Sequence, residues 1–247
     1  ATNLILQEFY SDNLDATLAS LVEGFTINGY TPLYIGERIN SVQNEYSDNY
    51  SVIKDCNMII GEMKDTKSEL AKQLLGTAWA IRSICYYNLL IRFCEPYNPI
   101  SAEDKLGLPL IDRFDMEAKP SRSDLKTTVS FIEEGFKNAI RYDISDTDYI
   151  FTSDVAKAYL TKLYFWTQQW EKAIQYAEEL LSKYPMLEAN QYEEVMQNKF
   201  TQSSNFILNP YTSESSLGSM AGSKAFFGSQ TPPGRLPMLL AIPKHVR

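Results

Sequence analysis

The chain has 247 residues and a mass of 28.2 kDa, and 44% of its residues are hydrophobic, so one large domain or two modest ones with a buried core are expected. It carries 23 Lys and Arg residues against 31 Asp and Glu, a net charge of −8. No run of basic residues occurs, which argues against binding along a nucleic-acid backbone. No segment approaches the roughly 18 apolar residues of a membrane-spanning helix, and the first twenty residues carry no signal-peptide pattern. We therefore expect a soluble chain.

The few cysteine and histidine residues exclude several kinds of site. Cys56, Cys85 and Cys94 are not spaced as a CxxC motif and lie in apolar helical patterns, so we expect small core residues. The single histidine, His245, lies near the end of the sequence, which removes Ser/His/Asp, Cys/His and HExxH chemistry. The sequence also lacks a phosphate loop, a nucleophile elbow and a metal-ligand cluster of known spacing. We therefore predict no catalytic residue, no cofactor and no metal site.

Apolar residues recur at helical spacing over residues 1–190, which predicts an all-α fold. A first helix is capped by Asp12 or Asn13 and is followed by a loop rich in Gly and Tyr over residues 24–49. The apolar face of the second helix is formed by Val52, Ile53, Cys56, Ile60 and Met63. Thr66 and Glu69 form a capping box that opens a third helix, which runs to about Phe93. Because this helix is apolar on nearly every side, with stripes that include Leu74 and Leu75, we expect it to be central and buried.

Prolines interrupt the helical pattern over residues 96–120 and leave one extended piece at residues 106–111. Ser123 is then expected to cap a fourth helix, with an apolar face formed by Leu125, Val129, Ile132, Phe136 and Ile140. An acidic loop leads from it to a helix pair across residues 154–184. The residues expected to face inward are Val155, Ala158, Tyr159, Leu163 and Trp166 in its first helix, and Ala173, Ala177, Leu180 and Leu181 in its second.

The helix pair has the spacing of a tetratricopeptide unit. Leu160, Tyr164, Ala173 and Pro185 stand at the expected offsets, so a bulky pair on the first helix meets a small residue on the second, and Pro ends that helix. An echo at Leu75, Gly76 and Trp79 lies 85 residues away, which predicts helix pairs separated by long loops rather than a uniform array. Beyond a short helix at residues 192–200, the segment 203–237 is rich in Gly, Pro and Ser and shows no sustained period.

Five motif blocks follow one another in order between residues 50 and 185. They are Tyr50 with Ile53 and Asn57; Leu75-Gly76 through Arg82, Tyr86-Tyr87 and Leu89-Leu90 to Phe93; Gly107-Leu108-Pro109-Leu110; Ser121-Arg122-Ser123 through Ile132, Phe136 and Ala139; and Phe151-Thr152, Ala156, Tyr159-Leu160 and Trp170 through Ala173 to Ala177. This order resembles the SusD/RagB family, surface lipoproteins that capture nutrients for a TonB-dependent transporter in Bacteroidetes. Two departures are Thr77-Ala78, where the family usually has Glu-Ala, and Cys94-Glu95, where Gly is common.

The resemblance implies a SusD-like helical domain with tetratricopeptide-like pairs over residues 1–202. Residues 203–247 are then the start of a loop-rich second region, which family members continue well beyond, so the chain is either a shortened relative or a fragment. The resemblance also implies binding rather than catalysis, an oligosaccharide or other nutrient as ligand, and a SusC-like TonB-dependent transporter as partner. It implies an outward-facing place on the outer membrane, through a lipid anchor removed upstream of Ala1.

Sugars are bound by flat aromatic faces together with planar hydrogen-bonding groups. The loop before the second helix has this mixture, in Tyr30, Tyr34, Glu37, Arg38 and Asn40, with Gln43 beyond them. In SusD-like proteins the loop at this place contributes to the ligand site, so we predict ligand-binding residues here. The alternative is that the tyrosines pack the loop onto helices.

Other candidate residues are given structural roles. Asn57 is expected to be a buried hydrogen-bonding residue, and Trp79, Trp166 and Trp170 are expected to pack in the core rather than to stack on carbohydrate. Phe226-Phe227 either line a site or fill a core gap. The carboxylate pairs Glu133-Glu134, Glu178-Glu179 and Glu193-Glu194 are expected on solvated helix faces, and Asp143, Asp146 and Asp148 in a loop that precedes a helix.

Two other functions compete with nutrient capture. A tetratricopeptide scaffold that binds a protein or peptide predicts a concave helical groove, and the uneven spacing of the helix pairs counts against it. A carbohydrate-active hydrolase needs two acids that converge in a cleft. No pair of carboxylates in the sequence has a spacing that indicates such a cleft.

Overall fold

The computed structural model describes residues 40–63, 65, 67–115, 117–144, 151–188 and 207–208, with the backbone alone for residues 40–44. The chain divides into two units, one formed by residues 47–210 and the other by residues 1–46 with 211–247. The fold described below is that of the first unit. The expected first helix, the short helix at residues 192–200 and the boundary after residue 202 lie outside the described residues and stay predictions.

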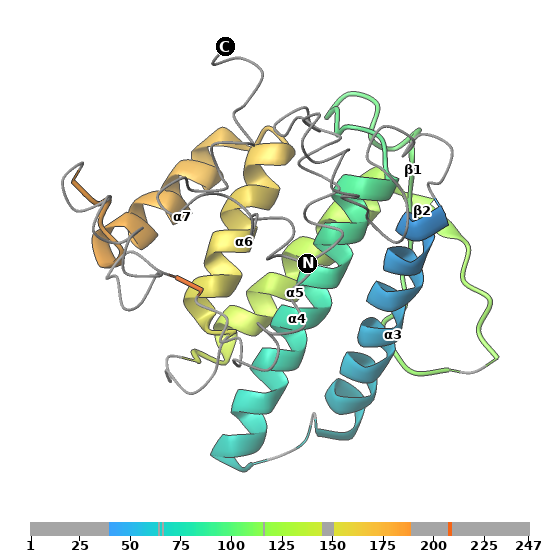
Figure 1. Ribbon diagram of the computed structural model, residues 1–247, viewed down its shortest axis with the longest axis horizontal. Helices are drawn as coiled ribbons and strands as arrows, with labels where there is room; N and C mark the ends of the chain where they lie inside the picture. The colour runs from blue at the N-terminus through green and yellow to red at the C-terminus, as the bar shows by residue number, and fades with distance from the viewer. Residues whose placement is uncertain are drawn as a thin grey trace, which may run out of the picture. The chain divides into compact units, whose positions relative to one another are not determined.

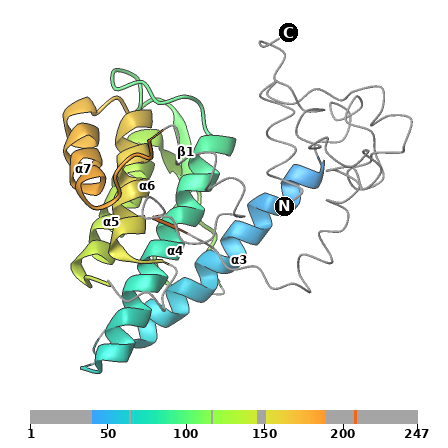
Figure 2. The ribbon, with the colours of Figure 1, turned by 60° about the vertical axis from the view of Figure 1, so that its left-hand side comes forward.

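The described elements confirm the all-α prediction. The helices are α3 (Asn40–Met63), α4 (Glu69–Phe93), α5 (Leu125–Arg141), α6 (Ser153–Trp166) and α7 (Trp170–Lys183), and the strands are β1 (Leu106–Pro109) and β2 (Arg122–Asp124). Helix α4 packs on α5 and α6, and α6 packs on α7. Helix α7 lies on the outer side of α6, away from α4, while α3 flanks α4 on the other side (Figures 1 and 2). Successive helices from α4 to α7 run in opposite directions, so the ends of α4 and α6 and the starts of α5 and α7 lie at the same end of the bundle (Figure 1).

Helix α4 is central and largely buried, as its all-round apolar sequence predicts. Leu75, Tyr86 and Leu89 are fully enclosed. Leu74, expected on a buried stripe, is instead exposed, because a helix covered on most sides by neighbours still leaves one edge open. The expected capping box is also wrong, since the helix begins at Glu69 with Ser68 at the N-cap position.

A small antiparallel sheet corrects the expected start of α5. Strand β1 lies within the predicted extended piece, and β2 pairs with it between Leu106 and Asp124 and between Pro109 and Arg122. The Ser123 hydroxyl donates to Leu108 O at 2.9 Å across this sheet. Ser123 is therefore not the cap. Asp124 takes that role, and its carboxylate accepts the Thr127 backbone N–H at 2.7 Å.

Helix α3 begins earlier than expected. Residues 40–49, predicted to end a loop, form its first turns, and its later turns are packed on the bundle through Ile53, Cys56 and Asn57. Cys56 and Cys85 are buried, as predicted for core residues, and Cys94 is half-buried. Burial raises the pKa of the Cys56 thiol to about 11 and that of Cys85 to about 12.

The helix pair forms at the predicted place, with a single buried face on α7. Leu160, Tyr164 and Ala173 are buried, as the spacing predicts. Trp166 and Leu181, predicted to face inward, are half exposed. The physical reason is that α7 packs mainly on α6, so the side of its apolar face that carries Leu181 stays uncovered among the described residues, and Trp166 is the last residue of α6, at the turn into α7.

Two glycines within helices differ in how closely other residues approach them. A Cβ at Gly76 on α4 would lie 2.5 Å from Ile144 Cδ1 and 2.8 Å from Tyr142 Cβ, whereas a Cβ at Gly61 on α3 meets nothing within 4 Å. We expect Gly76→Ala to lower the free energy of unfolding by about 1–3 kcal/mol through overpacking. Gly61→Ala is the matched control and should raise it by about 0.5–1 kcal/mol through helix propensity. Urea unfolding followed by circular dichroism measures both; equal effects of the two changes would contradict the packing shown.

Candidate ligand-binding site

The structure does not test the predicted ligand residues as a group. Tyr30, Tyr34, Glu37 and Arg38 lie outside the described residues, and Asn40 is the first residue of α3, with its side chain outside the description. Phe226 and Phe227 also lie outside it. What the structure describes is the anchorage of α3, which directly follows these residues in the chain, and a second place where aromatic side chains gather.

The anchorage of α3 centres on Arg82, a buried arginine of α4 that is 3% exposed. Its Nη1 donates to Asn57 Oδ1 at 2.7 Å and to the Asp112 backbone O at 3.4 Å. Asn57 in turn donates from Nδ2 to Ile111 O at 2.8 Å. The prediction that Asn57 is a buried hydrogen-bonding residue is therefore confirmed.

Two tyrosines complete the same network. The Tyr86 hydroxyl accepts the Ile111 backbone N–H at 2.8 Å and lies 3.2 Å from Ile111 O. The Tyr50 hydroxyl of α3 donates to Pro109 O at 2.9 Å, and the two tyrosine rings meet edge to face with their centroids 6.1 Å apart. Because both helices bind the segment 109–112, this segment joins α3 to α4.

The guanidinium of Arg82 is held by neutral oxygens and aromatic rings. Its Cζ lies 4.1 Å from the centre of the Trp79 ring and 5.3 Å from that of Phe131. Burial lowers the pKa of Arg82, and the neighbouring Tyr86 opposes this shift. With these partners, the guanidinium holds α3 and the segment 109–112 in position against α4. No such role is predicted for it above, although an arginine in the middle of a helix that is apolar on nearly every side indicates a buried polar contact.

A second polar junction joins α5, α6 and α7. Glu133 Oε1 accepts Lys137 Nζ at 2.6 Å and the Tyr164 hydroxyl at 3.0 Å, and lies 3.8 Å from Lys172 Nζ. Burial alone would raise the pKa of Glu133, but the hydrogen bonds from Lys137 and Tyr164 outweigh it and lower the pKa. The expectation of a solvated carboxylate is therefore wrong for Glu133, while its neighbour Glu134 is exposed as predicted.

Exposed aromatic side chains gather at the turn between α6 and α7. Among the described residues, the exposed aromatic side chains are Phe114, Phe165 (60%), Trp166 (55%) and Trp170 (50%). Core packing was predicted for Trp166 and Trp170 and is wrong for both, whereas Trp79 is half-buried beneath Arg82. The rings of Phe165 and Trp170 meet edge to face, with 5.3 Å between their centroids.

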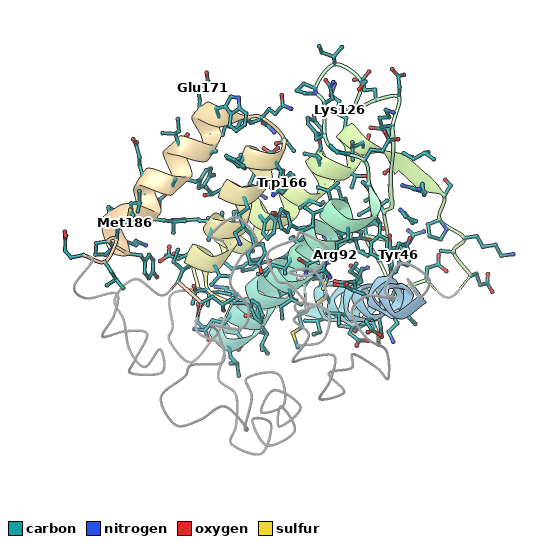
Figure 3. The ribbon with its side chains drawn as sticks, turned by 45° about the horizontal axis from the view of Figure 1, so that its top comes forward. Tyr46, Arg92, Lys126, Trp166, Glu171 and Met186 are labelled. Atoms are coloured by element: carbon teal, nitrogen blue, oxygen red, sulfur yellow. The ribbon has the colours of Figure 1, made fainter. Side chains whose placement is uncertain are left out.

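The turn that carries these rings is fixed by hydrogen bonds. Thr167 is buried, and its hydroxyl donates to Leu163 O at 2.9 Å. Gln169 Nε2 donates to that hydroxyl at 2.9 Å, and Gln168, with φ of 61°, donates from Nε2 to Tyr97 O at 3.3 Å. Glu171, near the start of α7, lies at the same end of the bundle as Lys126 near the start of α5 (Figure 3).

Neither a metal cluster nor a membrane span is found in the part of the chain that the structure describes. No group of three or more His, Cys, Asp or Glu residues there is arranged to hold a metal ion. None of the described helices has the length and apolar character needed to cross a membrane.

Comparison with known proteins gives one family and one fold. A SusD-like family model described as "Starch-binding associating with outer membrane" matches residues 7–165. No curated protein matches.

The solved structures with a similar fold are SusD-like proteins. Two SusD superfamily proteins each have a TM-score of 0.54. The one from Bacteroides vulgatus is 20% identical, covering 60% of this chain and 36% of its own, and the one from Bacteroides thetaiotaomicron is 23% identical, covering 61% and 35%. A SusD-like carbohydrate binding protein from Bacteroides vulgatus has a TM-score of 0.51 at 22% identity, covering 60% and 33%. The chain thus spans about a third of the length of these structures.

The anchorage of α3 is tested by removing the Asn57 amide. Asn57→Ala leaves the Arg82 guanidinium without its shortest acceptor and removes one of the two side-chain donors to Ile111 O. We expect the free energy of unfolding to fall by about 3 kcal/mol. Tyr50→Phe, which removes one hydrogen bond to the same segment, serves as the comparison and should cost about 1 kcal/mol. Urea unfolding measures both, and an Asn57→Ala effect no larger than that of Tyr50→Phe would show that the amide is not the centre of the network.

The Glu133 junction predicts a pH dependence. A carboxyl with a lowered folded-state pKa stabilises the fold above its ordinary pKa, and this stabilisation is lost as pH falls through the folded-state value. Glu133→Gln should therefore be less stable than the wild type at pH 7, with the difference shrinking below about pH 4. Glu134→Gln is the matched control, because Glu134 is exposed and its ion-pair partner, Arg141, lies on its own helix. Thermal unfolding from pH 3 to pH 7 measures the difference; a constant gap across this range would contradict the assignment.

Proposed function

We propose that this chain, which belongs to the SusD/RagB family, binds a nutrient glycan at the cell surface and delivers it to a SusC-like TonB-dependent outer-membrane transporter. The observation that carries the proposal is the family match over residues 7–165, whose description is starch binding in association with the outer membrane. The solved structures support the fold alone. The proposed activity is binding without turnover, and it requires no cofactor.

The proposed ligand contacts are Tyr30, Tyr34, Glu37, Arg38 and Asn40. Tyrosine rings offer flat faces to the C–H side of a sugar, while Arg, Glu and Asn offer planar hydrogen-bonding groups to its hydroxyls. These residues lead directly into α3, whose later turns are held by the Tyr50 and Asn57 hydrogen bonds. A loop that joins a well-anchored helix loses less conformational entropy on binding, which supports this location.

The cellular setting follows from the same proposal. An outward-facing lipoprotein, attached through a lipid anchor upstream of Ala1, holds the captured glycan beside the transporter. The helical bundle serves as the rigid base for this contact. Retention of the full-length protein in the outer-membrane fraction, and its co-purification with a transporter, are the observations on which this part depends.

The proposed site is tested by calorimetric titration with maltoheptaose, the probe suggested by the family description, beside cellohexaose, xylohexaose and laminarihexaose. We expect one of these to bind, and Tyr34→Ala and Arg38→Ala each to weaken its affinity about tenfold, because each removes a stacking face or a bidentate donor. Arg141→Ala is the matched control, since it removes an exposed arginine at the end of α5 and should leave affinity unchanged. If the wild type binds none of the four, or if all three variants behave alike, the proposal fails.

A further inference from the structure

We propose that the turn between α6 and α7 is a second carbohydrate-contacting surface, where Phe165 and Trp170 stack against sugar rings of a glycan. This inference rests on the proposed function, because it takes the class of ligand, a glycan, from it. It concerns residues far along the sequence from Tyr34 and Arg38, and it adds a site to the one proposed above.

The first support is the uneven distribution of exposed aromatic rings. Of four exposed aromatic side chains in the described residues, Phe165, Trp166 and Trp170 lie within six consecutive positions. The turn is closed without these rings, by buried Leu163, Tyr164 and Thr167. Exposed aromatic surface that the local fold does not need marks a place for a ligand or a partner.

The second support is the rigidity of the turn. Phe165 meets Trp170 edge to face, so the phenyl ring holds the indole while half of the indole surface remains exposed. The Gln168 and Gln169 amides tie the turn to Tyr97 O and to Thr167. A ring held in place before binding loses little conformational freedom when a sugar stacks on it, and such rings are effective contacts.

The third support is the polar surroundings of the rings. Gln168 and Glu171, which lie two positions before and one position after Trp170 in the sequence, are exposed. Amide and carboxylate groups close to a flat ring can recognise sugar hydroxyls next to the C–H face that stacks on the ring.

A glycan and a protein partner make different demands on this surface. A protein would use aliphatic and aromatic side chains alike, and the apolar surface does continue along α7 through Ile174, which is 56% exposed. A sugar needs the flat face itself. The observations favour the sugar, because the polar groups and the fixed edge-to-face pair both belong to the aromatic end of the surface.

The test distinguishes the effect of a flat aromatic face at position 170 from the effect of exposed apolar surface area alone. In the full chain, Trp170→Leu keeps an apolar side chain and removes the face, while Trp170→Phe keeps a face. Ile174→Ala is the matched control, since it removes a similarly exposed aliphatic side chain one turn away. Binding is followed by affinity electrophoresis in gels that contain soluble starch, cellulose ether, xylan or laminarin, and by calorimetry with the matching hexasaccharide or heptasaccharide.

The expected result is that Trp170→Leu weakens polysaccharide binding about five- to tenfold, whereas Trp170→Phe and Ile174→Ala stay within twofold of the wild type. Circular dichroism and the urea midpoint confirm that each variant is folded. If Trp170→Leu binds as the wild type does while Tyr34→Ala is weakened, this second surface is wrong and the proposed function stands. An equal loss in Trp170→Leu and Ile174→Ala also overturns it, in favour of a protein interface. If the wild type binds no polysaccharide, both proposals fail.

Discussion

The buried guanidinium of Arg82 sets the constraint that the rest of this unit has to meet. Moving a charge out of water costs several kcal/mol unless hydrogen bonds replace the lost hydration. Here those bonds come from Asn57 on α3 and from a backbone carbonyl of the segment that follows β1, with the Trp79 ring on the guanidinium face. No single element supplies enough partners. The guanidinium is satisfied only when α3, α4 and this segment are assembled together, so the interaction selects one arrangement of the three.

Polar contacts that are shared between elements also join the other helices. Glu133 is stabilised as a half-buried carboxylate only because Lys137 on its own helix and Tyr164 on the next both donate to it. The helix pair is therefore fixed to α5 by a polar contact as well as by its apolar face. A bundle joined in this way is a firm base for the binding function proposed above.

Sequence alone predicts the elements whose signal is local and misses what depends on a neighbour. The period of α5 identifies its core face, and the offsets of Leu160, Tyr164 and Ala173 identify the helix pair. The cap of α5 was misplaced by one residue because Ser123 and Asp124 are both good caps, and only the pairing of β2 with β1 decides between them. The role of Arg82 was missed for a similar reason, since its partners come from another helix and a distant segment. The ligand residues from Tyr30 to Asn40 are predicted from composition and resemblance, and they stay a prediction.

Trp79 and Trp170 show why residue type does not distinguish a core from a contact surface. Both lie in helices, and the same role was expected for both. The Trp79 face is covered by the Arg82 guanidinium, whereas Trp170 meets the edge-to-face ring of Phe165 and keeps half of its surface in water. An uncovered indole adds little to folding, because the apolar area that would stabilise the fold has not been buried. Its exposure is explained instead by a ligand that covers it, and a flat face beside amide and charged groups suits a sugar better than the interior of a helix bundle.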